Sequence, residues 1–251
     1  MKVTFLGTGT SHGVPVLGCS CPVCRSSDER DKRYRSSVWI EKNSTSIVID
    51  TGYEFRLSGI RAGIGKLDAV LYTHAHSDHI MGFDDLRVFT LEKKLPVYAS
   101  EKTLDDIKTK FPYAFIKDFF PGIPMCTGNV VRGYEPFCVN GIEILPIPLK
   151  HGLMEVYGYR IGSFAYLTDV SYIEEKAYGF LRGLDVLVIG ALREKSHPTH
   201  LSFGEAVEAI RRIKPGKAYF THINHETSYV DINAKYMPVA ESAYDGMVLE
   251  V

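Results

Sequence analysis

One short segment of this chain concentrates residues that could bind metal ions. Residues 73–79, with the sequence THAHSDH, include four potential ligands. His74, His76 and Asp78 alternate, so extended backbone would point them to one face and His79 elsewhere. Because adjacent side chains diverge in such backbone, all four ligands cannot reach one ion. The segment therefore predicts a site that holds two metal ions.

Three more potential ligands follow apolar, strand-like runs further along the chain. They are His151, Asp169 and His222. Ligands at strand ends are delivered from rigid elements into loops, as catalytic sites usually require. One such residue alone is more often a cap or a surface group. Together with the first segment, however, the three would complete a seven-residue set for two metals.

The composition of this set indicates its chemistry. Two divalent ions, opposed by Asp78, Asp169 and a bridging hydroxide, leave a formal excess of about one positive charge, which attracts an anion. Two ions roughly 3.5–4 Å apart can hold both oxygens of a displacement at phosphorus, and their bound water loses a proton near about pH 7. Imidazole and carboxylate ligands suit Zn²⁺ and Mn²⁺ comparably. The set predicts phosphodiester hydrolysis and leaves the metal open.

A second group of potential ligands lies near the amino terminus. Three cysteines in a loop that contains glycine and proline have the spacing Cys-x-Cys-x2-Cys: Cys19, Cys21 and Cys24. Three thiolates this close could bind one tetrahedral zinc, whereas three free thiols would be prone to oxidation. His225 is the best candidate for the fourth ligand because it lies three residues beyond His222, and His12 and His197 compete with it. We expect a structural zinc in a loop at about residues 18–25.

Short apolar runs bounded by turn residues predict the strands that position these groups. We expect strands at residues 3–6, 38–40, 47–49, 69–72, 130–131, 137–139, 142–145, 156–161, 164–167, 185–189, 218–220 and 247–251. Asn140-Gly141 predicts a hairpin turn. Helices are expected near Ser100, over residues 173–181 and over 202–213, where Ser202 and Glu205 form a capping box. Two groups of mainly antiparallel strands flanked by helices predict an α+β protein, an αββα sandwich.

Length and charge limit the remaining possibilities. The 251 residues suffice for one domain with a substantial core, and the net charge of -1, with mixed signs, gives no basic stripe for a nucleic acid. The amino terminus is too short in apolar residues for a signal peptide, and no later run reaches membrane-spanning length. We expect a cytoplasmic protein with no membrane and no stable nucleic-acid partner. Among the five cysteines, an odd number that argues against disulfides, Cys126 and Cys138 are expected to be ordinary small apolar residues.

The pattern His-x-His-x-Asp-His followed by distant His, Asp and His resembles the metallo-β-lactamase superfamily. The resemblance implies that one metal is held by His74, His76 and His151, that the other is held by Asp78, His79 and His222, and that Asp169 bridges them. It also implies that Asp50, in the sequence IDTG, orders the loop beside the metals. On sequence alone, a capping role for Asp50 at a helix that starts near Tyr53 is equally compatible.

Three features narrow the resemblance to the PhnP family of phosphoribosyl 1,2-cyclic phosphate phosphodiesterases. They are the opening FLGTGTSHGVP at residues 5–15, the cysteine loop, and THINH at residues 221–225. This family implies that Cys19, Cys21, Cys24 and His225 bind a structural zinc, and that His200 contacts the phosphate and protonates the leaving oxygen. The expected catalytic residues are Asp78, Asp169 and His200. The expected reaction is opening of a cyclic phosphate by a metal-bound hydroxide, giving ribose 1,5-bisphosphate.

Several alternatives stay open on sequence alone. A tRNA 3′-processing endonuclease would share the histidine motif, but the chain has no long basic insertion to hold tRNA, and another hydrolase of the same fold is also possible. From a different class, the chain could be a non-catalytic binding module stabilised by zinc. The aromatic segment 110–128 is expected in the core or at a contact between two copies of the chain, as in a homodimer, rather than at the substrate. Arg193 and Lys195 are expected to be solvated charges rather than phosphate contacts.

Overall fold

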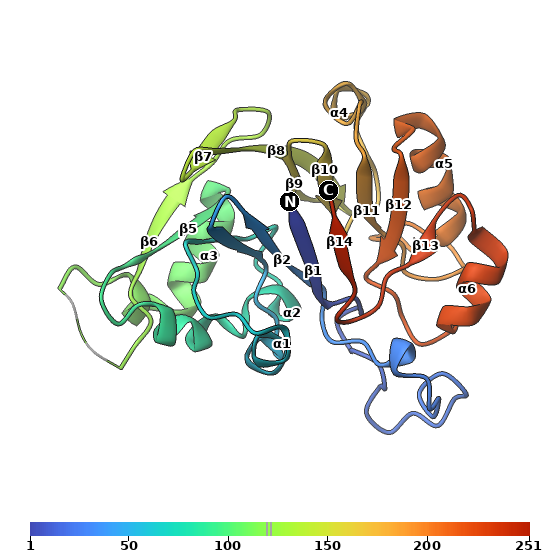
Figure 1. The fold of residues 1–251 in the computed structure, drawn as a ribbon, viewed down its shortest axis with the longest axis horizontal. Coiled ribbons are helices and arrows are strands. Elements are labelled where there is room, and N and C mark those ends of the chain that lie inside the picture. Colours follow the sequence, from blue (N-terminus) through green and yellow to red (C-terminus); the bar gives the residue numbers. More distant parts are fainter. Residues whose placement is uncertain (119, 121) are drawn as a thin grey trace.

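The computed structural model describes residues 1–118, 120 and 122–251, and shows two β-sheets packed face to face with helices outside them (Figure 1). The first sheet has seven strands in the order β14-β1-β2-β3-β4-β5-β6. Their bounds are Val248–Glu250, Lys2–Gly7, Ser37–Lys42, Thr45–Ile49, Ala69–Leu71, Leu95–Ala99 and Cys126–Val130. Pairing is antiparallel from β14 to β3 and parallel from β3 to β6.

The second sheet also has seven strands, in the order β13-β12-β11-β10-β9-β8-β7. Their bounds are Glu241–Ser242, Lys217–Thr221, Val186–Gly190, Phe164–Leu167, Met154–Ile161, Ile142–His151 and Phe137–Val139. Pairing is antiparallel from β7 to β10 and parallel from β10 to β13. Asn140 and Gly141 join β7 to β8 with positive φ angles of 48° and 80°, as the predicted two-residue turn requires.

Helices cover the outer faces of both sheets (Figure 1). The α-helices α1 to α6 span Phe55–Ala62, Ser77–Ile80, Glu101–Lys110, Glu175–Phe180, Phe203–Ile213 and Tyr229–Tyr236, and the 3-10 helices η1 to η3 span Glu29–Asp31, Phe83–Phe89 and Pro112–Phe115. The predicted capping box of Ser202 and Glu205 is present at the start of α5. The predicted αββα sandwich is confirmed. Its sheets are mixed rather than mainly antiparallel, because helices connect several strands as parallel crossovers.

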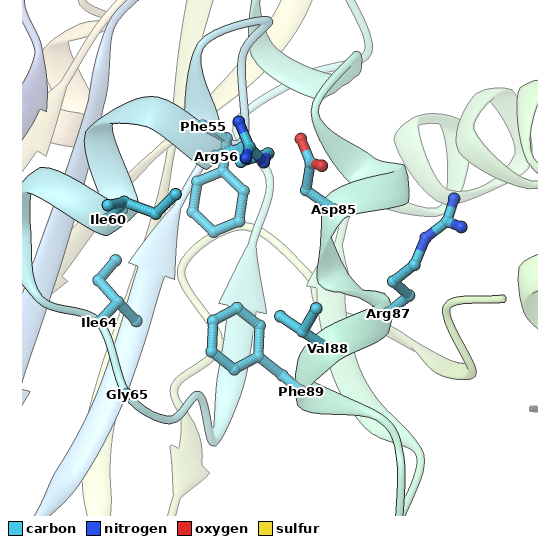
Figure 2. A pocket seen from close by; sticks show the side chains of 10 residues that line it. Phe55, Arg56, Ile60, Ile64, Gly65, Asp85, Arg87, Val88 and Phe89 are labelled. Carbon is cyan, nitrogen blue, oxygen red and sulfur yellow. The ribbon is translucent and has the colours of Figure 1, made fainter. Parts of the chain in front are cut away.

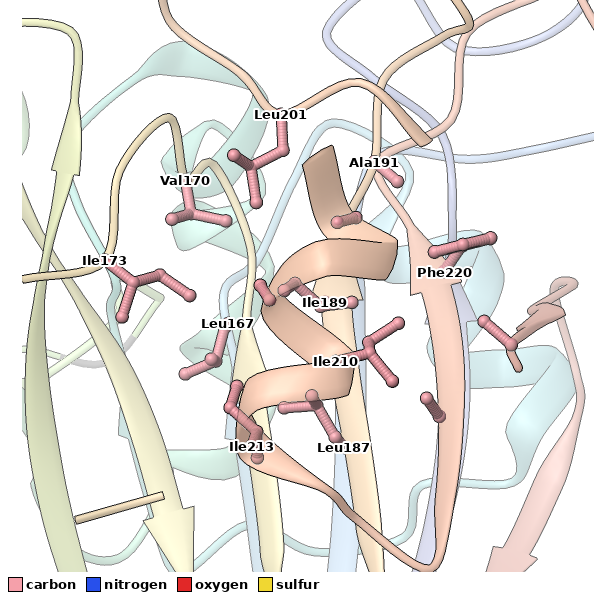
Figure 3. Close-up of a cluster of buried hydrophobic side chains, with 14 of the residues drawn as sticks. Leu167, Val170, Ile173, Leu187, Ile189, Ala191, Leu201, Ile210, Ile213 and Phe220 are labelled. Atoms are coloured by element: carbon pink, nitrogen blue, oxygen red, sulfur yellow. The ribbon is translucent and has the colours of Figure 1, made fainter. Parts of the chain in front are cut away.

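The core has layers that match this arrangement. Ile210 and Ile213 of α5 pack against Leu187 and Ile189 of β11 in one continuous buried cluster (Figure 3). A separate cluster fills the space between the two sheets, and a third lies under α3. Strand β11 is buried along its whole length because a helix covers one face and the other sheet covers the opposite face. Truncating a buried isoleucine such as Ile189 to alanine would cost roughly 2–5 kcal/mol.

The aromatic segment 110–128 divides between core and surface. Phe111 is buried, and its ring stacks on that of Phe83 with 4.9 Å between centroids. Tyr113 and Phe120 are 37% and 58% exposed, and Phe119 lies outside the described residues. The expected core role therefore holds for Phe111. Across the described part of the chain, no helix combines the length and apolar character needed to cross a bilayer.

Candidate metal centres

The predicted ligands meet at one edge of the sandwich because strand ends deliver them there. His151 is the last residue of β8, and Asp169 and His222 lie just beyond β10 and β12. Asp169 and His222 adopt positive φ angles of 50° and 59°, and Asp50, which follows β3, has 63°. Non-glycine residues rarely occupy this left-handed region, and when they do they are concentrated at functional sites. The backbone is thus held in a costly conformation at three positions around one point.

The first group consists of His74, His76 and His151, whose ligand atoms all lie within 4.8 Å of one another. His74 Nε2 and His76 Nδ1 are 2.9 Å apart. His151 donates a hydrogen bond from its Nδ1–H to the carbonyl oxygen of Thr199 over 2.6 Å. This donation leaves a lone pair on His151 Nε2, as metal coordination by that atom requires.

The second group consists of Asp78, His79, Asp169 and His222, all buried and again with ligand atoms within 4.8 Å. Asp169 lies between its neighbours: Oδ2 is 2.6 Å from His79 Nε2 and 3.9 Å from His74 Nε2, while Oδ1 is 3.0 Å from His222 Nε2. Both carboxylate oxygens of Asp169 therefore face histidines, and one of them also faces the first group.

Asp50 fixes the orientation of the His79 ring by binding its Nδ1–H. It accepts hydrogen bonds from Thr73 N–H and Thr73 Oγ1, each over 2.8 Å, and from His79 Nδ1–H over 2.7 Å. Helix α1 begins at Phe55 with Glu54 at its N-cap, so Asp50 does not cap it. Of the two alternatives that the sequence left open, the structure supports the role of ordering the loop.

Hydrogen bonding within this network directs lone pairs at the centre of the site. Thr73 Oγ1 donates its proton to Asp50, so the 3.0 Å contact between Thr73 Oγ1 and His74 Nδ1 has the imidazole as donor. His74 Nε2 then carries a lone pair, and His79 Nε2 does so when that ring is neutral, because its Nδ1–H is donated to Asp50. His79 Nε2 and Asp169 Oδ2 are buried without a hydrogen-bond partner in the described chain, although they lie 2.6 Å apart.

Such an arrangement requires a cation, either a proton on His79 Nε2 or a metal ion. Two lone pairs that face each other in a buried site repel, and each uncompensated polar group costs on the order of 1–3 kcal/mol. A divalent ion that accepts both lone pairs removes the cost. Nitrogen and oxygen donors in this number suit Zn²⁺ or Mn²⁺. The residues present therefore fit a metal centre.

Electrostatics around the ligands favour positive charge at the centre of the site. Burial, together with the neighbouring His79, lowers the pKa of His74 well below its usual value, so this ring is neutral. Burial opposes ionisation of Asp169, but His222 and His79 hold its pKa well below the usual range. Burial would lower the pKa of His79, yet Asp169, Asp78 and Asp50 raise it well above normal, so this ring is cationic when no metal ion is bound. Three carboxylates around one imidazole attract positive charge to this point.

His200 lies beside the ligands, where the sequence placed it. Its Nδ1 is 3.3 Å from Asp169 Oδ1, and its ring stacks on that of His222 with centroids 4.8 Å apart. Burial and the neighbouring His222 lower the pKa of His200 to about 3. His200 is thus a neutral imidazole within reach of any group bound near Asp169.

The cysteine loop forms a separate centre with His225. The Sγ atoms of Cys19, Cys21 and Cys24 lie 3.4, 3.4 and 3.5 Å from His225 Nδ1. With zinc–ligand bonds of about 2.3 Å to sulfur and about 2.0 Å to nitrogen, a tetrahedral ion separates these atoms by roughly 3.5 Å. The geometry therefore fits zinc, with His225 rather than His12 or His197 in the group.

A family model for the beta-lactamase superfamily domain matches residues 45–223, which contain all seven candidate ligands of the larger centre. The chain belongs to the metallo-β-lactamase superfamily. A crystal structure of a new diphosphatase from the PhnP family is 41% identical, covering 100% of this chain and 97% of that one, with a TM-score of 0.93. This metallo-β-lactamase chain is therefore PhnP-like and is a metal-dependent hydrolase, whose fold implies divalent metal ions.

Two further proteins are similar in sequence to this metallo-β-lactamase chain. An octanoyltransferase of Porphyromonas gingivalis is 38% identical over 250 residues, covering 98% of this chain but 51% of the relative. The chain thus spans about half the length of that relative. The exodeoxyribonuclease WalJ of Streptococcus pneumoniae is 23% identical over 226 residues, covering 78% of this chain and 80% of the relative.

Sequence reasoning missed a buried arginine, Arg33, that contacts the segment between the two centres of this metallo-β-lactamase fold. Arg33 donates to the carbonyl of Asn224 over 3.4 Å and pairs with Asp31 at 3.3 Å, both side chains being almost fully buried. Asn224 lies between His222 of one centre and His225 of the other. No local pattern marks Arg33, because its partner is 191 residues away.

The remaining cysteines and one sizeable cavity lie away from the metal centres. Cys126 is buried as expected, whereas Cys138 is exposed, so the expectation of an apolar packing role fails for Cys138. A cavity of about 590 Å³ between α1 and η2 is floored by Phe55 and Phe89 (Figure 2). It includes none of the candidate ligands, so hydrolysis is not expected there.

Proposed function

We propose that this hydrolase cleaves a small phosphodiester at a dinuclear centre, and that the substrate is a cyclic phosphate of the 5-phosphoribosyl 1,2-cyclic type, opened to ribose 1,5-bisphosphate. The observation that carries the proposal is the set of inward-facing Nε2 atoms of His74, His79 and His151, each left for a metal ion by a hydrogen bond from the opposite ring nitrogen. Similarity to a PhnP-family protein over the whole chain supports the phosphate chemistry.

Within this proposal the ligands divide into two sets that share one carboxylate. His74, His76 and His151 hold one ion, Asp78, His79 and His222 hold the other, and Asp169 is common to both. When bound, two divalent ions supply positive charge to the phosphoryl oxygens and lower the pKa of a water toward neutrality. The chain contributes preorganisation, since Asp50 and the carbonyl of Thr199 keep two ligand rings from turning.

His200 is proposed to hold the leaving oxygen. It lies next to Asp169 and contacts the rings of His151 and His222, with centroid separations of 4.6 and 4.8 Å. A neutral imidazole can donate one N–H hydrogen bond to the departing oxygen, and it can pass a proton to that oxygen where the negative charge of a bound substrate first converts the ring to imidazolium. The smaller centre, formed by Cys19, Cys21, Cys24 and His225, is proposed to bind a structural zinc.

A second candidate substrate class is a diphosphate. The PhnP-family structure that is 41% identical to this chain is described as a diphosphatase. A diphosphate and a cyclic diester both present a phosphoryl centre with an oxygen leaving group, so the same residues could act on either. A nuclease activity, as in WalJ, receives less support because the net charge is -1 and the sequence has no basic stripe for a long polyanion.

Metal content and turnover should be measured on the same preparation, purified without chelators. We expect about three metals per chain and hydrolysis of bis(p-nitrophenyl) phosphate. A panel of 5-phosphoribosyl 1,2-cyclic phosphate, a nucleoside diphosphate sugar, single-stranded DNA and RNA is then tested for turnover. Phosphorus NMR distinguishes ring opening, which gives one new monoester, from diphosphate cleavage, which gives two. One metal per chain and no turnover after addition of Zn²⁺ or Mn²⁺ would instead indicate a zinc-stabilised binding module.

A further inference from the structure

Most cations near the metal-binding edge are already paired with acids. Arg35, whose Cβ lies beside Gly52 and the backbone of Asp78, forms an ion pair with Glu54. The other pairs are Arg193 with Glu226 at 3.4 Å and Lys150 with Glu155 and Glu174 at 3.8 and 3.5 Å. Arg193 also donates to the carbonyls of Lys195 and Ser196. These side chains are therefore poorly placed to attract a substrate anion.

Lys110 differs from these cations. It is the last residue of α3, and its Nζ donates to the carbonyl oxygen of Ala75 over 2.7 Å, although 35 residues separate the two. Ala75 lies between the candidate ligands His74 and His76. Among the described residues no carboxylate pairs with Lys110, so no acid neutralises its ammonium group, and two N–H groups are left for another acceptor.

Lys110 lies beside the most exposed candidate ligand of the first group. Of the first ligand group, His74 and His151 are buried while His76 is exposed. Lys110 is exposed as well, and it contacts the residue that directly precedes His76. A substrate that reaches the buried ligands past His76 therefore passes the ammonium group.

Aromatic packing fixes the end of α3 at this place. Phe111, directly after Lys110, stacks on Phe83 with centroids 4.9 Å apart. Phe83 begins η2 shortly after α2, which carries Asp78 and His79. The backbone of Lys110 is thus tied to the loop that carries the ligands, while its four-carbon side chain can still turn toward a bound anion.

We propose that Lys110 binds a second anionic group of the substrate, namely a phosphoryl group other than the one attacked. This inference rests on the proposed phosphate hydrolysis and adds to it the residue that selects substrates with two phosphoryl groups. A cyclic phosphate with a distal phosphomonoester and a diphosphate share this chemistry. Lys110 acts as a specificity-determining residue, because a charge-assisted hydrogen bond to the distal group strengthens binding of such substrates.

The variants Lys110→Met and Lys110→Arg test this proposal, and Lys108→Met is the matched control. Lys108 is on the same helix, is exposed, and loses the same charge on substitution, but its Cε lies over Gly128 of β6 rather than Ala75. The kinetic constants kcat and KM are measured for ribose 1,2-cyclic phosphate with and without the 5-phosphate, and for a nucleoside diphosphate sugar. Calorimetric binding of methylenediphosphonate and of inorganic phosphate to the metal-loaded proteins gives a readout besides turnover.

We expect Lys110→Met to raise KM about tenfold or more for substrates with two phosphoryl groups and to weaken methylenediphosphonate binding similarly. The KM for the substrate without the 5-phosphate, inorganic phosphate binding and the metal content should be nearly unchanged. Lys110→Arg should restore most of the loss, and Lys108→Met should resemble the unmodified protein.

Two outcomes would overturn the assignment of Lys110. One is equal loss on substrates with one and with two phosphoryl groups, which would mean that Lys110 only supports the Ala75 carbonyl. The other is a change no larger than that of Lys108→Met. Failure of the proposed function is recognised separately, because the unmodified protein would then hydrolyse none of the phosphate substrates.

Discussion

His79 donates its Nδ1–H to Oδ2 of Asp50 over 2.7 Å, and neither side chain is accessible to solvent. The pair determines which tautomer of His79 is present, and therefore which ring nitrogen faces Asp169. A residue that binds no metal thus controls the coordination chemistry of one that is proposed to bind it.

Replacing Asp50 with asparagine should weaken metal binding. The carboxylate accepts three hydrogen bonds, two from Thr73 and one from His79, and an amide has only one oxygen with which to accept them. His79 then loses the partner that fixes its tautomer. We expect Asp50→Asn to reduce metal affinity and kcat by about 10–100-fold, measured by competition with a chelating dye and by hydrolysis of bis(p-nitrophenyl) phosphate.

A suitable control for this change is Asp85→Asn. Asp85 is a partly buried carboxylate that lines the cavity between α1 and η2, away from the candidate ligands. The Asp85→Asn variant should leave metal affinity unchanged. If Asp50→Asn bound metal as tightly as the unmodified protein, the role given to Asp50 would be wrong.

Loss of the smaller centre should lower stability, whereas loss of the larger centre should lower activity. Cys21 Sγ lies 3.4 Å from His225 Nδ1 and accepts the Cys24 N–H, and serine is a poorer zinc ligand. Since binding of a structural zinc contributes to folding, Cys21→Ser should lower Tm and remove about one metal per chain. Asp169→Ala should instead abolish turnover while the circular dichroism spectrum and much of the Tm are retained. Equal loss of folding in both variants would contradict this division of roles.

The sequence predicted which candidate ligands would lie together because their signals are local. Residues 73–79 and the cysteine loop are compact clusters, and His151, Asp169 and His222 follow apolar runs that form β8, β10 and β12. The sandwich followed from the same runs. The strand predicted at residues 130–131 begins earlier in the structure, as β6 at Cys126–Val130. Its start was missed because Thr127 and Gly128 of this edge strand are exposed and interrupt the run of apolar residues.

Residues that act through distant partners could not be predicted in this way. Lys110 meets Ala75 across 35 positions and Arg33 meets Asn224 across 191, so neither has a neighbour in sequence that reveals its role. Helix α2 was also missed, because the alternation of His74, His76 and Asp78 suggested extended backbone. In the structure the helix begins at Ser77, and this change of conformation turns His79 toward Asp169. The short strand β13, with two residues, gave no periodic signal.

The pH dependence of stability should include a contribution from Asp245. This carboxylate accepts hydrogen bonds from Thr8 Oγ1 and the Tyr34 N–H, each over 2.7 Å, and burial raises its pKa from 3.8 to about 6. A raised pKa in the folded state means that the folded protein binds the proton more tightly than the unfolded chain. The stability contribution of Asp245 is therefore fully present below about pH 4 and is lost as the pH rises through about 6.

Urea unfolding of the metal-saturated protein and of Asp245→Ala, at several pH values between about 4 and 7, isolates this contribution. The difference in unfolding free energy between the two proteins should fall by about 3 kcal/mol over that range, since about two pKa units correspond to that amount. A difference that stayed constant with pH, or rose with it, would show that Asp245 is not perturbed in this direction.

Thiol reactivity should separate the five cysteines into three classes. The thiolate is the reactive form, so access to reagent and pKa together determine the rate of alkylation. Cys138 is exposed and should react first, whereas Cys126 is buried and its pKa is raised by that burial to about 12, so it should react only after unfolding. Cys19, Cys21 and Cys24 should resist iodoacetamide until a chelator removes the metal that we propose they bind.

Peptide mass spectrometry over time gives the order in which the five thiols react, and Cys138→Ser should remove the fast phase alone. Rapid labelling of the three clustered cysteines in metal-loaded protein would exclude a metal at that centre.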